Sequence, residues 1–500
     1  MQTNKKNVTI ALLVATFLTA IEGTIVSTAM PTIVSDLLGF ERMNWVFAVY
    51  LLTMTAATPI FGKLADLFGR KRMFTIGVIL FLIGSALSGM ARSMDQLIWF
   101  RAFQGLGAGA VLPITMTIIG DIYPFEQRAK IQAYISSVWG IAGVAGPLVG
   151  GFFVQQLSWR WIFYINIPFG LISMAMIWAY LHESFDKRKR HIDYAGAATF
   201  TIGITALLLA LQQGSERLAW NSPDVLALFA LAALFIAVFL LIQSRSPEPM
   251  MPLKLFRIRG IAVSNAVSFL ASMTLIGVTV YIPVWMQGLN GFSPTQAGMS
   301  LAPMSVGWMI GAMIGGRLLV KKGARLTSAF GTAILLGSAV WLAAVDMHTP
   351  QIVFLVIVFI LGTGFGFAFT VYGVVVQSAV DWSLRGAATA SNTLLRSLGQ
   401  TVGIAILGNL FNRMIASRLN MEPSGLNGVS PDDMNRLINP EQAVALPEAV
   451  RELLRNVLET GLHNLFIVLA VISLMCLLVT LMLPRPKTMP EPAKANVRQG

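Results

Sequence analysis

The sequence predicts an all-α integral membrane protein with fourteen membrane-spanning helices. Three observations predict this class. First, 55% of the 500 residues are hydrophobic and only 12% are charged, and the mean hydropathy of +0.70 is far from the balance of a soluble domain. Second, apolar runs of about 20 residues, the length of helix that crosses a bilayer, recur along the chain. Third, the basic residues fall mainly between these runs.

The predicted spans follow one another closely. The first begins after Lys5 and Lys6 and could pass for a signal peptide, but it is too long for one and contains a carboxyl group, so we interpret it as a retained span. In order, the spans are Val8–Pro31, Trp45–Phe61, Phe74–Met90, Leu97–Ile119, Ile131–Val154, Trp161–Tyr180, Ala195–Leu211, Val225–Ile242, Ile261–Met286, Ala297–Leu319, Leu326–Val345, Ile352–Val376, Ala390–Phe411 and Leu462–Leu483.

An even number of spans places both termini on one side of the membrane. Lys and Arg concentrate in the connections on that side, such as residues 70–72, 187–190 and 321–325, and are sparse in the short connections on the other. Because basic loops stay in the cytoplasm, we expect a multi-pass protein of the cell membrane with both termini cytoplasmic.

A short internal repeat predicts two related halves. Gly62 and Gly69 follow the second span, and Gly316 and Gly323 follow the tenth at the same spacing, amid basic residues. Two halves that rock around a central site are a common transporter architecture. The predicted organisation is an N-terminal six-helix bundle (1–183), two inserted spans with basic linkers (184–256), a C-terminal six-helix bundle (257–483) with a long outer loop (412–461) that contains an amphipathic helix, and a disordered cytoplasmic tail (484–500).

Composition and motifs argue against other classes. The net charge of +13 does not indicate a nucleic-acid partner, because the basic residues form no single patch with interleaved aromatic residues. The lone Cys476 excludes a disulfide framework and a CxxC metal or redox site. The four His lie in loops or at span ends, and no hydrolase, metalloprotease or P-loop motif occurs. We therefore expect no enzyme activity, no catalytic residue, no metal and no organic cofactor.

Glu22 is the acidic residue that lies well inside an apolar run. An ionisable group at membrane depth costs several kcal/mol, so its default interpretation is part of an ion or substrate pathway. In an apolar cavity such a carboxyl can exchange its proton within the working pH range. The alternative is a structural carboxyl that only forms hydrogen bonds between helices.

The connection after the second span carries the strongest local signal. Gly62 and Gly69 permit a tight turn and close helix approach, and Asp66 is placed to pair with Arg70 or to cap the next helix. Such contacts would latch neighbouring helices together. The alternative is a basic loop with an ordinary salt bridge.

The fifth span combines small residues with a bend. Gly143, Gly146 and Gly150 fall close to one helix face, so a neighbouring backbone can approach closely, and Pro147 kinks the helix. This pattern suits a helix that pivots between two states, although small-residue faces also occur in static bundles.

Three further charged residues are candidates. Arg101, near the start of the fourth span, either faces the bundle interior or snorkels to the interface. Arg396, in the thirteenth span, is a secondary candidate that could instead pack helices together. Asp121, at the end of the fourth span, is a secondary candidate that we expect to anchor a loop.

Several segments together resemble one known family. They are residues 62–72 (GKLADLFGRKR), 101–109 (RAFQGLGAG), 140–151 (GIAGVAGPLVGG), 159–168 (WRWIFYINIP) and 395–400 (LRSLGQ). They are similar, in order and at the corresponding spans, to the motifs of the major facilitator superfamily, and more narrowly of its fourteen-span drug:proton antiporters. The chain departs from that family at Glu22, where an Asp is usual. Glu keeps the carboxyl and lengthens the side chain by one methylene.

The resemblance implies a major facilitator fold and a function. The expected protein is a proton-coupled antiporter that exports hydrophobic, cationic drugs by alternating access, with protons as the coupling ion. Glu22 and Arg101 would handle protons and substrate, and Gln104 and Gly105 would complete the fourth-span motif. We expect a monomer in the lipid bilayer; whether an adaptor protein takes part is open. The alternative function is proton-coupled export of a lipid or an endogenous metabolite.

Overall fold

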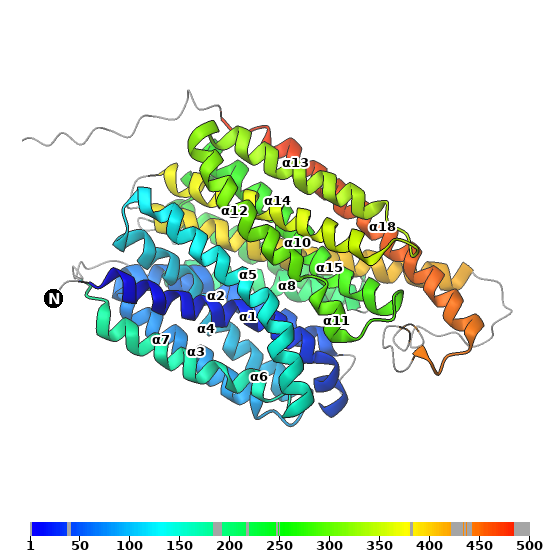
Figure 1. The fold of residues 1–500 in the computed structure, drawn as a ribbon. Coiled ribbons are helices and arrows are strands. Elements are labelled where there is room, and N and C mark those ends of the chain that lie inside the picture. The colour runs from blue at the N-terminus through cyan, green and yellow to red at the C-terminus, as the bar shows by residue number, and fades with distance from the viewer. Residues whose placement is uncertain are drawn as a thin grey trace, which may run out of the picture.

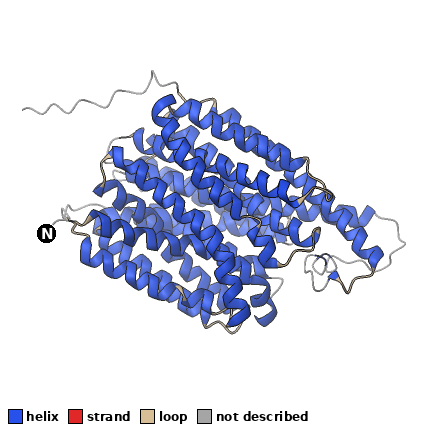
Figure 2. Ribbon diagram, in the orientation of Figure 1, coloured by secondary structure: helices blue, strands red, loops and turns tan. Residues whose placement is uncertain are grey.

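A computed structural model describes residues 3–37, 42–183, 193–216, 220–246, 249, 251–380, 384–421, 434, 437 and 443–484. All regular secondary structure in these residues is helical (Figure 2). Long helices run side by side across the molecule and are joined by short turns at its two ends (Figure 1). This arrangement suits a bilayer, because a helix satisfies its backbone N–H and C=O groups internally where water is absent.

Short connections link most of the described helices. In order, they are α1 (Lys5–Leu37), α2 (Met43–Phe68), α3 (Arg70–Gly89), α4 (Met94–Ile122), α5 (Phe125–Gln156), α6 (Trp161–Tyr164), α7 (Asn166–Tyr180), α8 (Tyr194–Glu216), α9 (Pro223–Arg245), a 3₁₀ turn (Leu253–Arg257), α10 (Arg259–Gly288), α11 (Pro294–Met299), α12 (Ala302–Lys322), α13 (Ala324–Ala343), α14 (Gln351–Ser378), α15 (Arg385–Met421) and α18 (Glu448–Thr480).

The predicted membrane class is confirmed. Thirteen of the described helices are long and apolar enough to cross a membrane, and Ala195–Leu211 within α8 is a shorter apolar helix. That shorter helix is the predicted seventh span, so the count of fourteen stays a prediction. We call the end of the molecule that holds the N-terminus the N-terminal face, and the other end the opposite face (Figure 1).

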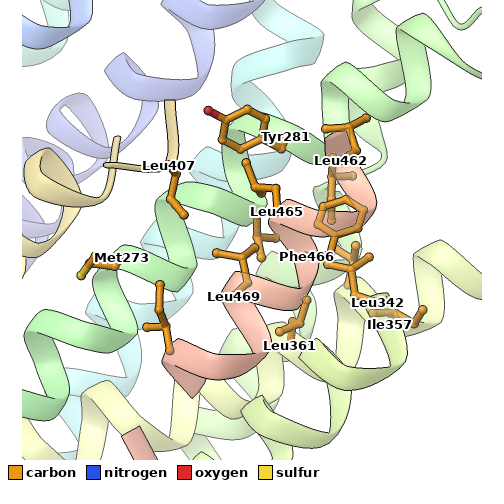
Figure 3. Packing of buried hydrophobic residues seen from close by; sticks show 14 of the residues in the cluster. Met273, Tyr281, Leu342, Ile357, Leu361, Leu407, Leu462, Leu465, Phe466 and Leu469 are labelled. Atoms are coloured by element: carbon orange, nitrogen blue, oxygen red, sulfur yellow. The ribbon is translucent and has the colours of Figure 1, made fainter. Parts of the chain in front are cut away.

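Buried apolar side chains gather in separate clusters along the chain. Residues from α1 to α7 form two clusters, and a larger one draws on α10, α13, α14, α15 and α18. In the larger cluster, Leu465, Phe466 and Leu469 of α18 pack among residues of α10, α13 and α14 (Figure 3). Helices α8 and α9 pack on each other, with the Phe200 and Phe239 ring centroids 5.2 Å apart. The domain limits at 183 and 256 stay a prediction.

Two glycines end the helices where the internal repeat places them. Gly69 separates α2 from α3 at φ 93°, and Gly323 separates α12 from α13 at φ 79°. Only glycine adopts such values without strain. The connection predicted over residues 62–74 is therefore a single residue, and Gly62 lies inside α2, where a Cβ would come 4.0 Å from the Cβ of Ala390.

The segment 412–461 is more helical than the predicted loop. Helix α15 continues to Met421, and α18 begins at Glu448 and runs without a break into the last span. Leu454 and Leu458 are buried in the large cluster while Glu448 points to solvent, so an amphipathic stripe extends the helix. Of the predicted tail, residues 485–500 lie outside the described residues.

Candidate functional site

Glu22 and Arg101 form a buried ion pair between α1 and α4. The Glu22 side chain has no exposed surface, Arg101 is 1% exposed, and Arg101 Nη1 donates to Glu22 Oε1. Arg101 therefore faces the bundle interior rather than the membrane interface. A charge removed from water is tolerated when an opposite charge and hydrogen bonds compensate it. Glu22 and Arg101 each give the other an opposite charge and a hydrogen bond.

Side chains from neighbouring helices complete the network. Asn166 Nδ2 donates to Glu22 Oε2 and to Ser85 Oγ, both at 2.9 Å. Ser85 Oγ donates in turn to the Phe163 carbonyl at 2.8 Å. The carboxyl of Glu22 is thus held by α4 and by the first residue of α7, which is itself fixed to α3.

The fourth-span motif positions Arg101. Gln104 lies one turn further along the same face of α4, and its Oε1 accepts from Arg101 Nη1 at 2.8 Å. The Tyr50 ring of α2 lies under the guanidinium, with its centroid 4.2 Å from Cζ. Gly105 allows this approach, because a Cβ there would come 2.1 Å from Thr53 Oγ1 and 2.4 Å from the Tyr50 carbonyl oxygen.

The network contains polar atoms without a partner. Among the described residues, Gln104 Nε2, Asn166 Oδ1 and the Tyr50 hydroxyl are buried and form no hydrogen bond. Buried polar atoms are nearly always satisfied. Three unsatisfied atoms around one carboxyl suit a network that has a second arrangement, in which Glu22 or a ligand takes other partners.

The glycine face of the fifth span supports the helix that carries Glu22. A Cβ on Gly146 would come 2.0 Å from Thr24 Oγ1, and one on Gly150 would come 3.1 Å from the Ile25 carbonyl oxygen. Thr24 Oγ1 also donates to the Ala142 carbonyl at 3.2 Å. Helix α5 therefore packs directly on α1, two residues beyond Glu22.

The same face of α5 reaches the C-terminal part of the chain. A Cβ on Gly143 would come 2.2 Å from Ser305 Oγ of α12, and Gly298 of α11 lies against Pro147. The segment 140–151 thus brings α1 and α12 onto one helix. These contacts lie toward the opposite face, whereas α2 and α15 meet through Gly62 and Ala390 near the N-terminal face.

Arg70 and Asp121 meet at the N-terminal face. The two side chains form an ion pair between the start of α3 and the end of α4. The role of Asp121 as a loop anchor stays a prediction. The Asp66 side chain lies outside the described residues, so its predicted role in the latch stays a prediction.

Glu183, which the sequence analysis missed, caps α3. Its carboxylate accepts the backbone N–H of Arg70 at 2.9 Å and of Lys71 at 3.1 Å. Lys71 Nζ returns the contact by donating to the Trp178 and Leu181 carbonyls at 2.8 and 2.9 Å. An acid just after a predicted span, beyond an interfacial Trp, is the signal that would have suggested it.

Glu183→Ala is expected to lower the free energy of unfolding by about 1 kcal/mol, because the substitution removes an acceptor from two orphan N–H groups at a helix start. Thermal unfolding of the purified chain measures this. Glu183→Gln keeps one acceptor oxygen and should lose less. An unchanged transition in the Ala variant would show that the cap contributes nothing.

A polar cluster on the opposite face fixes the other end of α1. Trp159 Nε1 donates to Asp36 at 2.9 Å and Arg160 Nη1 donates to it at 3.1 Å. Arg160 also donates to the Ala91 carbonyl at 3.3 Å, next to the turn between α3 and α4. The hydrogen bond from Trp159, with that from Arg160, holds the pKa of Asp36 below its usual value. The 159–168 motif thus docks α1 onto its neighbours.

Arg396 lies apart from these groups on α15. Its Cζ stands 4.0 Å from the centroid of the Phe369 ring of α14. The structure does not bring it into contact with Glu22 or Arg101, so the predicted site residues divide between an N-terminal network and a separate C-terminal cation.

Comparison with known proteins gives the family. Residues 12–404 match the family model of the Major Facilitator Superfamily. The chain is 36% identical to Multidrug resistance protein 3 of Bacillus subtilis (strain 168), over 99% of this chain and 98% of that protein. It is 35% identical to the Multidrug transporter protein MdtP of the same strain, over 91% of this chain and 88% of that protein.

A solved structure has the same fold. It is the crystal structure of a bacterial homolog of the human lysosomal transporter Spinster, in an inward-facing and unoccupied conformation, with a TM-score of 0.61, 17% identity and coverage of 95% of this chain and 97% of that one. At this identity the likeness shows the fold alone. From the family model and the two relatives together, the chain belongs to the major facilitator superfamily and is a membrane transporter rather than an enzyme.

Proposed function

We propose that the protein is a proton-coupled antiporter that exports hydrophobic drugs by alternating access. The observation that carries the proposal is the fully buried Glu22, held by Arg101 and Asn166 within a transporter fold. The names of the two Bacillus relatives support drugs as the cargo class.

The chemistry of the ion pair supports the proposal of proton coupling. When Glu22 is ionised, its charge is balanced by Arg101. When Glu22 takes up a proton, the attraction is lost and Arg101 is left as an uncompensated cation, so the network has to rearrange. A proton and a cargo that interacts with either group then bind in competition, which is the minimal requirement for antiport.

The helix contacts support the proposal of alternating access. Glu22 lies on α1, α1 packs on the Gly146 face of α5, and α5 packs through Gly143 on Ser305 of α12. A rearrangement at Glu22 thereby reaches the contact between the two parts of the chain without passing through a loop. Two rigid halves that rock about a central site use such contacts as their pivot.

Orientation and assembly belong to the same proposal. The basic N-terminal face would be cytoplasmic and the opposite face outside the cell, in keeping with the distribution of Lys and Arg. The chain would act as a monomer in the cell membrane with protons as its coupling ion. A cationic cargo would require the Glu22 carboxylate to leave its ion pair with Arg101 when the cargo binds.

Gly146→Leu is expected to abolish transport, because the added side chain starts 2.0 Å from Thr24 Oγ1 and 3.1 Å from the Ile25 backbone nitrogen, and α1 cannot approach α5. Dye efflux from cells, corrected for the amount of protein in the membrane, measures the effect. Gly316→Leu is the control, since no atom lies within 4 Å of a Cβ there. Normal efflux by the Gly146 variant would argue against a moving α1–α5 contact.

The proposed function is tested with the purified chain in liposomes. Uptake of a fluorescent dye is measured with a pH gradient alone, a voltage alone and neither. We expect accumulation against the dye gradient when the pH gradient is imposed. Transport that only equilibrates the dye would contradict proton coupling, and absence of transport for dyes and antiseptic cations would favour a lipid or metabolite as cargo.

A further inference from the structure

Arg396 is a cation within the membrane-spanning part of the chain, and no acidic side chain among the described residues of its own half pairs with it. Helices α10 to α15 contain no Asp or Glu. Glu22, the acidic residue that lies well inside an apolar run, already pairs with Arg101. Among the described residues, Arg396 forms no ion pair and no hydrogen bond. Its guanidinium lies over the Phe369 ring in a cation–π contact.

The guanidinium is not sealed in the protein core. The Arg396 side chain is partly accessible, and none of its nitrogens belongs to the buried polar atoms that lack a partner. Its N–H donors therefore keep some accessible surface beside the Phe369 ring. Arg101 differs on both counts, since it is 1% exposed and its donors reach Glu22, Gln104 and the Val46 carbonyl.

A platform of parallel aromatic rings adjoins Arg396. Trp308 of α12 stacks on Phe369 with centroids 5.2 Å apart and planes at 19°, and on Phe365 at 5.8 Å and 29°. Phe365 and Phe369 are inclined by 13° to each other. The rings are held rigidly, because Gly366 of α14 packs against the backbone of α12, where a Cβ would come 2.1 Å from the Trp308 carbonyl oxygen.

We propose that Arg396, Phe369 and Trp308 form a subsite for the acidic end of the cargo, which we infer to be a planar aromatic compound that carries a carboxylate. The inference rests on the proposed function, in that the bound compound is a transported drug. The guanidinium presents a fork of N–H donors that matches a carboxylate. The partly exposed Trp308 ring, backed by the buried Phe365 and Phe369 rings, presents flat apolar surface to an aromatic group.

The subsite also changes the expected charge of the cargo. With Glu22 and Arg101 balancing each other, Arg396 leaves the described interior with a net positive charge, which disfavours a purely cationic compound. A zwitterion fits both halves, with its carboxylate at Arg396 and its cationic group on the side of Glu22.

The test measures binding of a matched pair of probes to the full-length chain in lipid nanodiscs. Calorimetry at pH 7 compares naphthalene-2-carboxylate with naphthalene-2-carboxamide, which share the ring system and differ in charge. We expect the carboxylate to bind the unmodified protein about tenfold more tightly, the size of one charge-assisted hydrogen bond. Equal binding of the two probes would overturn the proposal without any variant.

Three variants test which residues produce the preference for the carboxylate probe over the carboxamide probe. Arg396→Gln should bind both probes equally, and Arg396→Lys should keep part of the preference because it retains the charge but not the fork. Phe369→Leu should weaken both probes by a similar factor. Arg42→Gln is the matched control, because Arg42 is exposed and pairs with Asp95, and it should keep the full preference. An undiminished preference in Arg396→Gln would overturn the proposal.

The binding and transport experiments distinguish failure of the subsite proposal from failure of the antiport proposal. A protein that discriminates between the probes but shows no pH-driven dye movement in liposomes keeps the subsite and loses the antiport proposal. A protein that pumps dye but binds the two probes equally keeps antiport and loses the subsite.

Discussion

Glu22→Gln is expected to reduce pH-driven dye accumulation in liposomes to the level of liposomes without protein. The amide has nearly the shape of the carboxyl and keeps one acceptor oxygen, which can accept from Arg101, while its NH2 group replaces the oxygen that accepts from Asn166. It cannot take up or release a proton. Facilitated movement of dye down its own gradient should remain. Glu448→Gln is the matched control, because Glu448 is almost fully exposed at the start of α18, and it should transport normally.

The same substitution should also lower stability, for a separate reason. Neutralising Glu22 leaves Arg101 buried without its counter-charge, and removing one partner of a buried pair costs about 3–5 kcal/mol. The double variant Glu22→Gln, Arg101→Gln should recover part of this loss in thermal unfolding while remaining uncoupled. A well-folded single variant with full pH-driven accumulation would remove Glu22 from the coupling mechanism.

Gly107→Ala is expected to destabilise the chain by about 3 kcal/mol, at the upper end of the usual cost of overpacking. A Cβ at this position of α4 would come 2.2 Å from the Phe81 backbone nitrogen, 2.6 Å from Phe81 Cα and 2.7 Å from the Gly77 carbonyl oxygen. All three atoms belong to the α3 backbone, so no change of rotamer can relieve the clash and the two helices have to separate.

The yield of monodisperse protein and its thermal transition in detergent measure the effect. Gly120→Ala, on the same helix, is the control, because a Cβ there meets no atom within 4 Å. We expect that variant to match the unmodified protein. If Gly107→Ala were equally stable, the close packing of α3 on α4 would not be a constraint on the fold.

The fold class could be predicted from the sequence because the bilayer constrains the composition and length of each span separately. Each span has to be apolar and about 20 residues long, and this pattern is visible without knowledge of its neighbours. Outside the spans the prediction was less complete. The amphipathic helix expected within 412–461 lies at the start of α18, where Leu454 and Leu458 are buried, but the sequence analysis did not predict that α18 and α15 continue their spans into this segment.

The candidate site could be predicted in part. Glu22 stands out because a carboxyl inside an apolar run is costly wherever it lies, and the resemblance to a known family singled out Arg101. Asn166 and Ser85 did not stand out, because a single amide or hydroxyl in a span is common and their roles arise from three helices meeting in space. Glu183 resembled an ordinary loop acid for the same reason.

The central claim is that a proton on Glu22 and the cargo displace each other. Proton release on cargo binding tests it most directly, with a pH indicator in weakly buffered solution and the purified chain in detergent. The account predicts release of about one proton for each bound cargo molecule from the unmodified protein and none from Glu22→Gln. Equal proton release from both proteins would contradict it.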